Sequence, residues 1–293
     1  MPIPLAGAAT LVAVIDAGSM EAAAARLHIS PSAVSQRIRA LEAEVGRVLL
    51  VRTKPMRPTP AAHAVVRFAR QVALLEHDAA RELGDGETRV VMPLAVNADS
   101  LGTWFLAPLA RVSARHPIVF DLHRDDQDFT AAMLEDGTVT GAVTSRAEPV
   151  AGCRVQPLGT LRYEAVATPG FVREWLPDGV TPAALARAPL IDFDRRDDLQ
   201  TRWLIAQRVE PAAPPRHRVP ASHDFAAATE LGLGWALLPR LQSEAALAAG
   251  RLALLGGPEI EVPLYWQQWN LRSALLTAVA DEIVAEGRRV LSG

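Results

Sequence analysis

Residues 19–45 constrain the fold most, because their pattern predicts two short helices joined by a tight turn. Ser19 stands where an N-cap is expected, and apolar residues follow it with the i, i+3, i+4, i+7 spacing of one buried helical face. Ser30 and Pro31 match the cap and the first residue of a second helix, where the missing N–H of proline costs nothing. The segment therefore predicts a helix-turn-helix.

The second of these helices has two chemically different faces. Apolar residues at positions 34, 38, 41 and 45 share the face that we expect to be buried, and Gly46 is a natural helix terminator. The opposite face carries groups that can read a major groove, since Gln can bond to adenine and Arg to guanine. The alternative is a solvated face on an ordinary helical hairpin, in which the serines are only caps. The residues of this face are Ser32, Ser35, Gln36 and Arg39.

The flanking segments favour DNA binding. Residues 47–59 fit a short β-hairpin wing with a basic tip, whose side chains would lie beside phosphates. Residues 5–17 supply a preceding helix, with Leu5, Val12 and Ile15 as its apolar stripe. The predicted DNA-contacting residues are Ser30, Ser32, Ser35, Gln36, Arg37, Arg39, Arg52, Lys54 and Arg57.

This order of elements resembles the LysR-type transcriptional regulators over residues 5–62. The resemblance rests on Ser-x-x-x-Ala-Ala-x-x-Leu-x-Ile-Ser-x-Ser-Ala-Val-Ser-x-x-Ile-x-x-Leu-Glu-x-x-x-Gly and on the Arg-Thr and Thr-Pro pairs of the wing. The chain departs slightly at the wing, where it has Leu-Leu-Val-Arg and the family usually has Leu-Phe-x-Arg. The resemblance implies a winged helix-turn-helix domain over residues 1–59.

Charge is distributed unevenly along the 293 residues, whose formal net charge is −3. Residues 1–59 carry a net +3, so the remainder carries −6. A basic head on an acidic body fits local DNA contact by the head. The only cysteine, Cys153, excludes an internal disulfide and a Cys-rich metal site. Since no signal peptide or 18-residue apolar span is recognisable, we expect a cytoplasmic protein.

Residues 60–87 predict a linker helix. Thr59 and Pro60 repeat the cap-plus-proline start, and Gly84 and Gly86 mark the end. Apolar residues at 65, 68, 72, 75 and 79 form a two-heptad seam, which favours pairing with a second copy because helix-turn-helix proteins usually read paired half-sites. The alternative is a helix packed on its own domain. The family resemblance implies a homodimer through this helix, extended to a homotetramer.

Residues 88–293 alternate between strand and helix patterns, which predicts α/β architecture with parallel sheets. We expect two subdomains facing a cleft. The family resemblance implies a periplasmic-binding-protein-like effector domain, with subdomain I at 88–162 plus 268–293 and subdomain II at 163–267. The strands are expected at 90–96, 118–122, 139–144, 163–167, 190–193, 216–219, 235–238 and 264–269, and the helices at 100–115, 129–136, 198–207, 225–231 and 274–290.

The ends of these strands should hold a ligand, since open α/β sheets bind ligands at carboxyl ends of strands. We expect Ser100 to cap a helix that attracts a carboxylate, with acids nearby to pair with a cation. This suits a zwitterion with an extra positive charge, such as lysine or arginine. Alternatively, Asp99 or Asp126 is a helix cap and Arg146 neutralises a neighbour. The candidate effector-binding residues are Asp99, Ser100, Thr103, Asp126, Thr144, Arg146, Asp192, Phe193, Asp194 and Ser222.

A narrower resemblance points to the basic-amino-acid-export regulators, the LysG/ArgP branch of the LysR family. It is carried by Val-Asn-Ala-Asp-Ser-Leu-x-Thr-Trp, Gly-Ala-Val-Thr, Phe-Asp-x-x-Asp-Asp, Gly-Trp-x-Leu-Leu-Pro and Leu-Tyr-Trp-x-x-Trp, which begin at residues 96, 141, 193, 234 and 264. The resemblance implies a sensor of lysine, arginine or histidine that activates an exporter gene. It places Ser100, Thr103, Asp126 and Thr144 at the pocket.

The sequence thus predicts a regulator that binds double-stranded DNA and responds to an effector by a population shift, with RNA polymerase as a further partner. A LysR-type regulator with another small effector and an architectural DNA-binding protein without effector are the alternatives. We expect no enzyme, because no Gly-x-Ser-x-Gly, Walker loop, metal triad or Gly-x-Gly-x-x-Gly is present. Catalytic residues, a metal site and a resident cofactor are accordingly expected to be absent.

Overall fold

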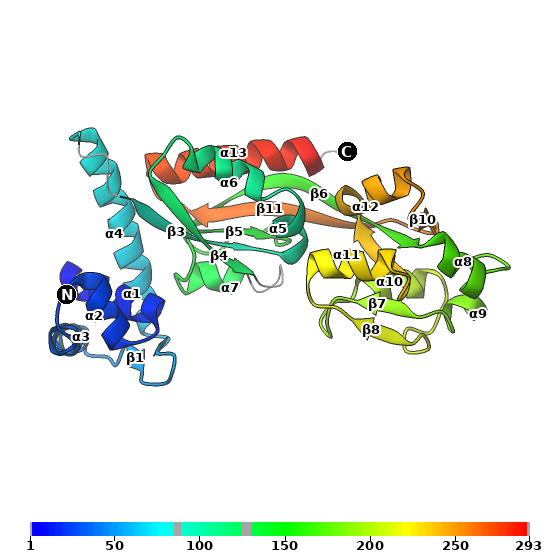
Figure 1. The fold of residues 1–293 in the computed structure, drawn as a ribbon. Coiled ribbons are helices and arrows are strands. Elements are labelled where there is room, and N and C mark those ends of the chain that lie inside the picture. Colours follow the sequence, from blue (N-terminus) through cyan, green and yellow to red (C-terminus); the bar gives the residue numbers. More distant parts are fainter. Residues whose placement is uncertain (1, 85–88, 125–129, 292–293) are drawn as a thin grey trace. The chain divides into compact units, whose positions relative to one another are not determined.

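The computed structural model describes residues 2–84, 89–124 and 130–291 (Figure 1). Contacts within the chain define two compact units. The first unit comprises Met1–Val96, Ala107–Gln156 and Tyr265–Val284, and the second comprises Asn97–Leu106, Pro157–Leu264 and Ala285–Gly293. The sequence-based division assigns residues 97–106, 157–162 and 285–293 to subdomain I, whereas the contacts group them with the second unit. It assigns residues 265–267 to subdomain II, whereas the contacts group them with the first unit.

The N-terminal helices have the caps that the sequence predicts. They are α1 (Leu5–Ala17), α2 (Met20–Leu27) and α3 (Pro31–Val45). The Ser19 hydroxyl accepts a hydrogen bond from the Ala22 N–H at 3.1 Å, and the Ser30 hydroxyl accepts one from the Ala33 N–H at 3.2 Å. Gly46 ends α3 in the left-handed conformation, with φ of 68°. The predicted helix-turn-helix is confirmed.

The buried face of α1 differs from the predicted stripe. Leu5 is 49% exposed, and Val12 and Ile15 are only half-buried. Leu11 and Val14 are fully buried instead, in a core shared with α2, α3 and the following helix. Nearly every residue of α1 is apolar, so the sequence pattern does not mark which side faces this core. In α3, the terminal position 45 is half-buried, whereas positions 34, 38 and 41 are buried as expected.

The wing consists of β1 (Leu50–Val51) and β2 (Arg57–Pro58), which pair antiparallel. The linker helix α4 (Ala62–Glu82) follows it. Thr59 and Pro60 do not cap this helix, contrary to the sequence-based expectation, because α4 begins two residues later. The Thr59 hydroxyl donates to the Val48 carbonyl oxygen at 2.8 Å, so it fastens the wing.

The side chains of the predicted seam on α4 become more exposed from the start of the helix to its end. Val65 is buried against the N-terminal helices, Phe68 and Val72 are half-buried, and Leu75 and Ala79 are exposed. The start of α4 therefore packs on its own head, as the alternative interpretation expects. Its second half leaves apolar side chains exposed.

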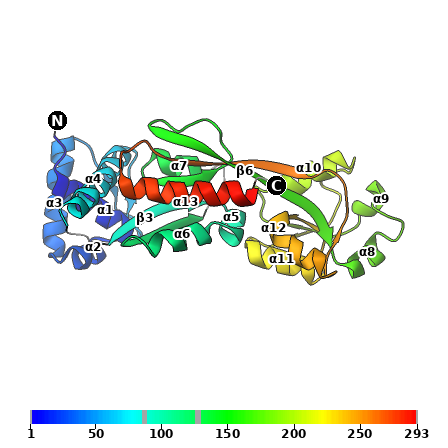
Figure 2. The same cartoon turned by 90° about the horizontal axis from the view of Figure 1, so that it is seen from above.

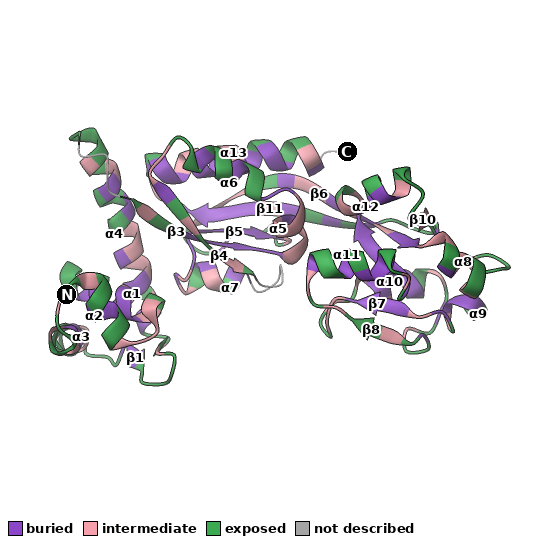
Figure 3. Cartoon of the chain, viewed as in Figure 1, coloured by how far each residue is buried: buried purple, intermediate pink, exposed green. Residues whose placement is uncertain are grey.

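The rest of the first unit is a mixed sheet with helices on both faces. Strand β3 (Val90–Val96) lies parallel to β4 (Ile118–Arg124) and to β5 (Gly141–Thr144). Tyr265–Gln268 of β11 (Ile260–Trp269) pairs antiparallel with β5. Helices α6 (Leu106–Ser113) and α13 (Ala274–Leu291) lie over one face and α7 (Thr130–Glu135) under the other (Figures 1 and 2). Figure 3 shows β5 and β11 as largely buried.

The second unit contains two groups of strands and six helices among its described residues. Strand β6 (Cys153–Ala167), which starts in the first unit, pairs antiparallel with β9 (Ala236–Pro239) and β10 (Ala253–Leu254). Strand β7 (Leu190–Asp192) lies parallel to β8 (Arg216–Arg218). The helices are α5 (Ala98–Thr103), α8 (Pro169–Trp175), α9 (Pro182–Leu185), α10 (Leu199–Ala206), α11 (Ser222–Glu230) and α12 (Arg240–Ala248).

Three expectations for the α/β region are corrected. The sheets are mixed rather than parallel, because β6 and β11 pair antiparallel with their neighbours. The expected helix at 100–115 is two helices, since the chain breaks at Trp104, whose side chain is buried in edge contact with Phe105. The strand expected at 163–167 starts at Cys153 and includes Pro157 and Gly159, residues that normally argue against a strand. Helices α8, α9 and α12 and strand β10 were not predicted.

No helix formed by the described residues is long and apolar enough to cross a membrane.

Candidate DNA-contacting surface and effector site

The polar face of α3 lies opposite the buried one, as the sequence predicts. Gln36 and Arg37 on this face are exposed. The Arg39 guanidinium donates to the Ser35 hydroxyl at 2.9 Å, which orients the arginine along the helix surface. The Ser30 and Ser32 hydroxyls lie 2.9 Å apart at the start of the helix. The face therefore presents donors and acceptors that a groove could engage.

The wing presents its basic side chains to solvent. Arg52, Lys54 and Arg57 are all exposed. The Thr53 hydroxyl donates to the Pro55 carbonyl oxygen at 2.7 Å and so orders the tip between the two strands. Exposed cations on a wing next to a helix-turn-helix can contact phosphates without a large cost of desolvation.

Asp99 is the centre of a polar cluster in the second unit. Its carboxylate accepts hydrogen bonds from the Tyr163 hydroxyl at 2.7 Å and the Ser222 hydroxyl at 2.8 Å. The Gln242 amide donates to the Ser222 carbonyl oxygen at 3.0 Å, and this hydrogen bond helps to hold Ser222 in place. Burial raises the pKa of Asp99, although both hydroxyl donors favour its ionised form. The structure thus joins two predicted residues, Asp99 and Ser222, with two that the sequence did not single out.

Asp197 is a second destabilised carboxylate in the same unit. Its oxygens accept hydrogen bonds from the backbone N–H groups of Leu199 at 3.1 Å and Phe193 at 3.2 Å. Burial raises its pKa to about 6, and the negative charges of Asp192 and Asp99 add to that rise, while the two N–H donors oppose it. The sequence analysis missed this residue. The available signal was its place in the acidic motif directly after a buried strand.

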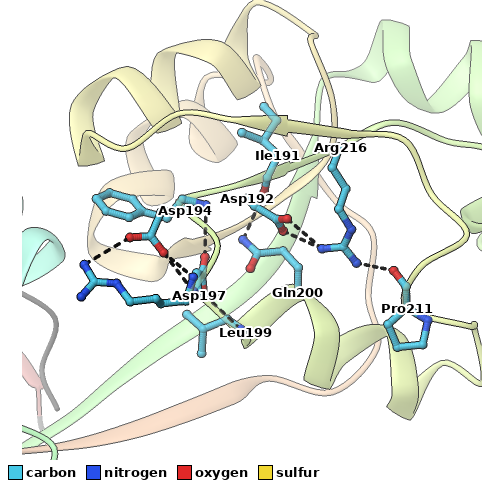
Figure 4. Close-up of polar contacts among 10 residues, drawn as sticks. Ile191, Asp192, Asp194, Asp197, Leu199, Gln200, Pro211 and Arg216 are labelled. Carbon is cyan, nitrogen blue, oxygen red and sulfur yellow. Dashed lines mark hydrogen bonds and ion pairs between the residues drawn. The ribbon is translucent and has the colours of Figure 1, made fainter.

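Asp192 differs from Asp197, although both lie in the region shown in Figure 4. It is 3% exposed, and its two oxygens lie 2.9 and 2.8 Å from the same guanidinium nitrogen of Arg216. Arg216 also donates to the Pro211 carbonyl oxygen. Asp192 therefore already has a cationic partner within the protein. Asp194 accepts from the N–H groups of Arg196 at 2.7 Å and Asp197 at 3.1 Å, so it shapes the loop.

Helix α5 brings further polar groups to the second unit. Asn97 is its N-cap residue, so the expectation that Ser100 caps it is wrong; Ser100 lies in the first turn. Ser100 is fully buried, and its hydroxyl has no hydrogen-bond partner among the described residues. The side-chain oxygen of Asn97, which is 6% exposed, also lacks one there. The Thr103 hydroxyl donates to the Asp99 carbonyl oxygen at 2.6 Å.

The remaining candidates are two residues of the first unit, one of the second unit and one outside the described residues. Thr144 is buried at the end of β5, and its hydroxyl accepts from the Arg146 N–H at 3.1 Å. The Arg146 side chain is exposed. Phe193, in the second unit, packs near Phe225 with ring centroids 6.3 Å apart. Asp126 lies outside the described residues.

Metal and thiol chemistry find little support in the described part of the chain. No group of three or more His, Cys, Asp or Glu side chains there could hold a metal ion. Cys153 is a free, half-buried thiol, and burial raises its pKa, which lowers the fraction of reactive thiolate.

Comparison with known proteins gives two family matches. Residues 5–63 match the family described as bacterial regulatory helix-turn-helix protein, lysR family, and residues 85–288 match the LysR substrate binding domain. The lysine export transcriptional regulatory protein LysG of Corynebacterium efficiens is 42% identical over 281 residues, which are 95% of this chain and 96% of that one.

Two solved structures are similar over their whole length. The crystal structure of ArgP from Mycobacterium tuberculosis is 42% identical with a TM-score of 0.86 and covers 98% of each chain. Full-length LysG from Corynebacterium glutamicum with bound effector Arg is 38% identical with a TM-score of 0.78; the match covers 99% of this chain and 100% of that one.

Proposed function

We propose, because the chain belongs to the LysR family of bacterial helix-turn-helix regulators, that it is a transcriptional regulator whose effector is a basic amino acid. The observation that carries the effector class is the pair of destabilised carboxylates in the second unit, Asp99 and Asp197. Burial makes the ionised form of each unfavourable, and the negative charge of Asp99 adds to the rise in the pKa of Asp197. A cationic ligand would relieve both costs at once.

The charge balance around these acids supports a cation rather than an anion. Asp192 is neutralised by Arg216, and Asp194 is engaged by backbone N–H groups and the nearby Arg196 guanidinium at 3.6 Å. Within the described residues, the partners of the Asp197 carboxylate are backbone N–H donors, and those of the Asp99 carboxylate are hydroxyl donors. We therefore assign Asp99 and Asp197 to the cationic groups of the effector and leave Asp192 to its internal partner.

A zwitterion would also use the uncharged groups on α5. The Ser100 hydroxyl can donate to a carboxylate, and the Asn97 side-chain oxygen can accept from an ammonium group. A buried polar group without a partner costs free energy, so a ligand that engages these atoms gains affinity. The proposed effector-binding set also includes the other predicted residues, which are Thr103, Thr144, Arg146, Asp126, Phe193, Asp194 and Ser222.

The relatives narrow the choice of ligand and target. One similar structure holds arginine as its effector, and a similar protein is named for lysine export. We propose arginine, lysine or histidine as the effector and an amino-acid exporter gene as the target that it activates. The protein would act without a catalytic step, a resident cofactor or a metal, with the division into 1–59, 60–87 and 88–293 proposed above.

The DNA-binding part of the proposal rests on the exposed polar face of α3 and the basic wing. Two copies joined through the exposed half of the α4 seam would place two such faces on a double-stranded operator, with a homotetramer formed from two dimers. RNA polymerase is the further partner that activation requires. The contacting residues would be Ser30, Ser32, Ser35, Gln36, Arg37, Arg39, Arg52, Lys54 and Arg57.

The test is a titration of the full-length protein with L-arginine, L-lysine and L-histidine by calorimetry. The operator, selected by the protein from a random duplex library, is then titrated in the presence and absence of each amino acid. We expect one or more of them to bind and to change the operator affinity. Absence of binding by all three would overturn the basic-amino-acid effector, and absence of any selected duplex would overturn the DNA-binding role.

A further inference from the structure

We propose that the linker helix α4 is fastened to the α/β part of its own chain by a two-point latch, formed by Asp78 and Arg67, and that this latch transmits the effector signal to the DNA-binding helices. The signalling half of this inference rests on the function proposed above. The latch itself rests on contacts within the first unit.

The first point of the latch is the cap of helix α13, in which Asp78 of α4 accepts hydrogen bonds from the helix start. Helix α13 begins at Ala274, and its first N–H groups have no partner within the helix. The Asp78 carboxylate accepts from the Ala274 N–H at 2.9 Å and approaches the Leu275 N–H at 3.4 Å. Ser273, the local residue, accepts from the Leu276 N–H at 3.2 Å. A negative charge at this end of an 18-residue helix is favourable, so Asp78 holds α13 by hydrogen bonds and charge.

The second point is a close approach of α4 to two turns. The Arg67 guanidinium donates to the Ala151 carbonyl oxygen at 2.9 Å. Gly137 and Gly152 have φ of +81° and +74°. A Cβ on Gly137 would lie 2.9 Å from the Arg67 backbone nitrogen, and one on Gly152 would lie 2.4 Å from its guanidinium. Both turns thus depend on glycine where Arg67 lies against them.

These two points occupy one side of α4. Positions 67 and 78 are eleven residues apart, which is three turns and about 20° of an ideal helix. Leu74, between them on the same side, is buried at 3% exposure, and Arg81 continues the line with a 3.1 Å contact to the His116 ring. The predicted seam, centred on Phe68, Val72 and Leu75, lies roughly a third of a turn away. The helix therefore has one side for its own body and another free for a second copy.

Helix α4, which carries Arg67 and Asp78, contacts the DNA-binding head near its start and helix α13 near its end. At the head, Arg70 of α4 pairs with Asp16 of α1 at 2.6 Å, and Val65 packs in the core of the head. At the other end, Asp78 holds the first turn of α13, and the last residues of α13 belong to the second unit, which contains Asp99 and Asp197. A change in the second unit that shifts α13 would act on α4 through Asp78.

The test compares Asp78→Ala with Asp78→Asn, which keeps one acceptor oxygen, and with Glu76→Ala, which removes an exposed acid from the same helix. All variants are full-length. Hydrogen exchange of the peptide covering residues 272–278 reports the cap. We expect exchange there to accelerate by about tenfold in Asp78→Ala, less in Asp78→Asn, and not in Glu76→Ala. Unchanged exchange in Asp78→Ala would overturn the latch, whatever the protein's function.

The signalling half is tested by the ratio of operator affinities without and with L-arginine. We expect this ratio to move towards one in Asp78→Ala, while the arginine affinity stays within about threefold of the unsubstituted protein. Faster exchange with an unchanged ratio would overturn the signalling role and leave a structural cap. If the unsubstituted protein itself gives a ratio of one with every basic amino acid, the proposed function fails, and exchange alone decides the latch.

Discussion

The polar side of α3 and the acidic cluster of the second unit, Asp99 and Asp197, differ in how far water reaches their functional groups. Gln36 and Arg39 are exposed, so their charges and dipoles cost little before a partner arrives. Asp99 and Asp197 are partly buried, and this burial raises the pKa of both. The polar side of α3 is therefore suited to a large, hydrated anionic partner that is surrounded by counterions. The acidic cluster is suited to a small cation whose binding removes an existing cost.

The largest expected effect concerns the internal ion pair that separates Asp192 from the proposed ligand-binding acids. Arg216→Met should leave the Asp192 carboxylate buried and unpaired, which costs about 3–5 kcal/mol of unfolding free energy. Chemical denaturation at pH 7 measures this. The comparison predicts that Asp192→Asn with Arg216→Met recovers part of the loss, because the double variant removes the buried charge. Unchanged stability in Arg216→Met would mean that Asp192 does not depend on Arg216, and would place Asp192 among the ligand groups instead.

Asp197→Asn should abolish most of the effector affinity without harming the fold. The loss of one charged partner in a buried site costs about 2–5 kcal/mol, which is roughly 30-fold or more in the arginine dissociation constant. The free variant should be no less stable at pH 7, because ionised Asp197 costs stability once the pH exceeds its unfolded value. Calorimetry and thermal unfolding measure the two quantities. Normal arginine affinity would remove Asp197 from the site.

Arg39→Ala tests the exposed polar face of α3. A base-contacting arginine contributes about 1–3 kcal/mol, so the operator dissociation constant should rise by roughly 5- to 150-fold, with arginine binding unchanged. Gel-shift titration against the selected operator measures it. Arg47→Ala, outside the predicted contact set but exposed at the end of α3, is the matched control for lost charge. Equal losses in both variants would indicate general charge rather than base contact.

The smallest effect is the pH dependence of effector affinity. Since burial raises the pKa of Asp197 to about 6 and the cation binds the ionised form, affinity should increase with pH and level off above about 6. Between pH 5 and 7 the gain should be about tenfold for L-arginine, whose own charge is constant in this range. The part of the dependence centred near pH 6 should be lost in Asp197→Asn. A flat profile in the unsubstituted protein would mean that Asp197 does not face the ligand.

The stability of the protein without effector should decrease as Asp197 ionises. Asp197 has a higher pKa in the folded chain than in the unfolded one, so its contribution favours the folded state below about pH 4 and is lost as the pH rises through about 6. Asp197→Asn should therefore flatten this part of the stability profile. Arginine should offset the loss most strongly above pH 6.

The head could be predicted almost completely, because its signals are local. Two serine caps, a proline and a glycine terminator fix the helix ends, and the polar face of α3 follows from a period of 3.6 residues. The prediction of the buried side of α1 was wrong, because an almost uniformly apolar helix has no pattern that distinguishes its sides. Contacts with three other helices choose that side.

The acidic cluster could be predicted only in part, because its members are joined by tertiary contacts. Asp99 and Ser222 were expected at strand ends, yet their bond to each other spans 123 residues. Tyr163 was read only as part of a strand, and the true length of β6 was hidden by Pro157 and Gly159. Asp197 carried no local signal beyond its acidic neighbours. Its special property comes from burial and from charges on other segments.

The packing of α4 on the head has a consequence for building hybrid regulators. Val65 and Val66 are buried in the core of the head, and Arg70 pairs with Asp16 of α1. A head cut at residue 59 would expose these contacts to water. A hybrid that transplants this head to a foreign sensor therefore needs α4 at least as far as Arg70, and one that borrows the sensor needs Arg67 and Asp78. Both requirements fall on one helix, so the exchangeable part of this protein is the head and linker together.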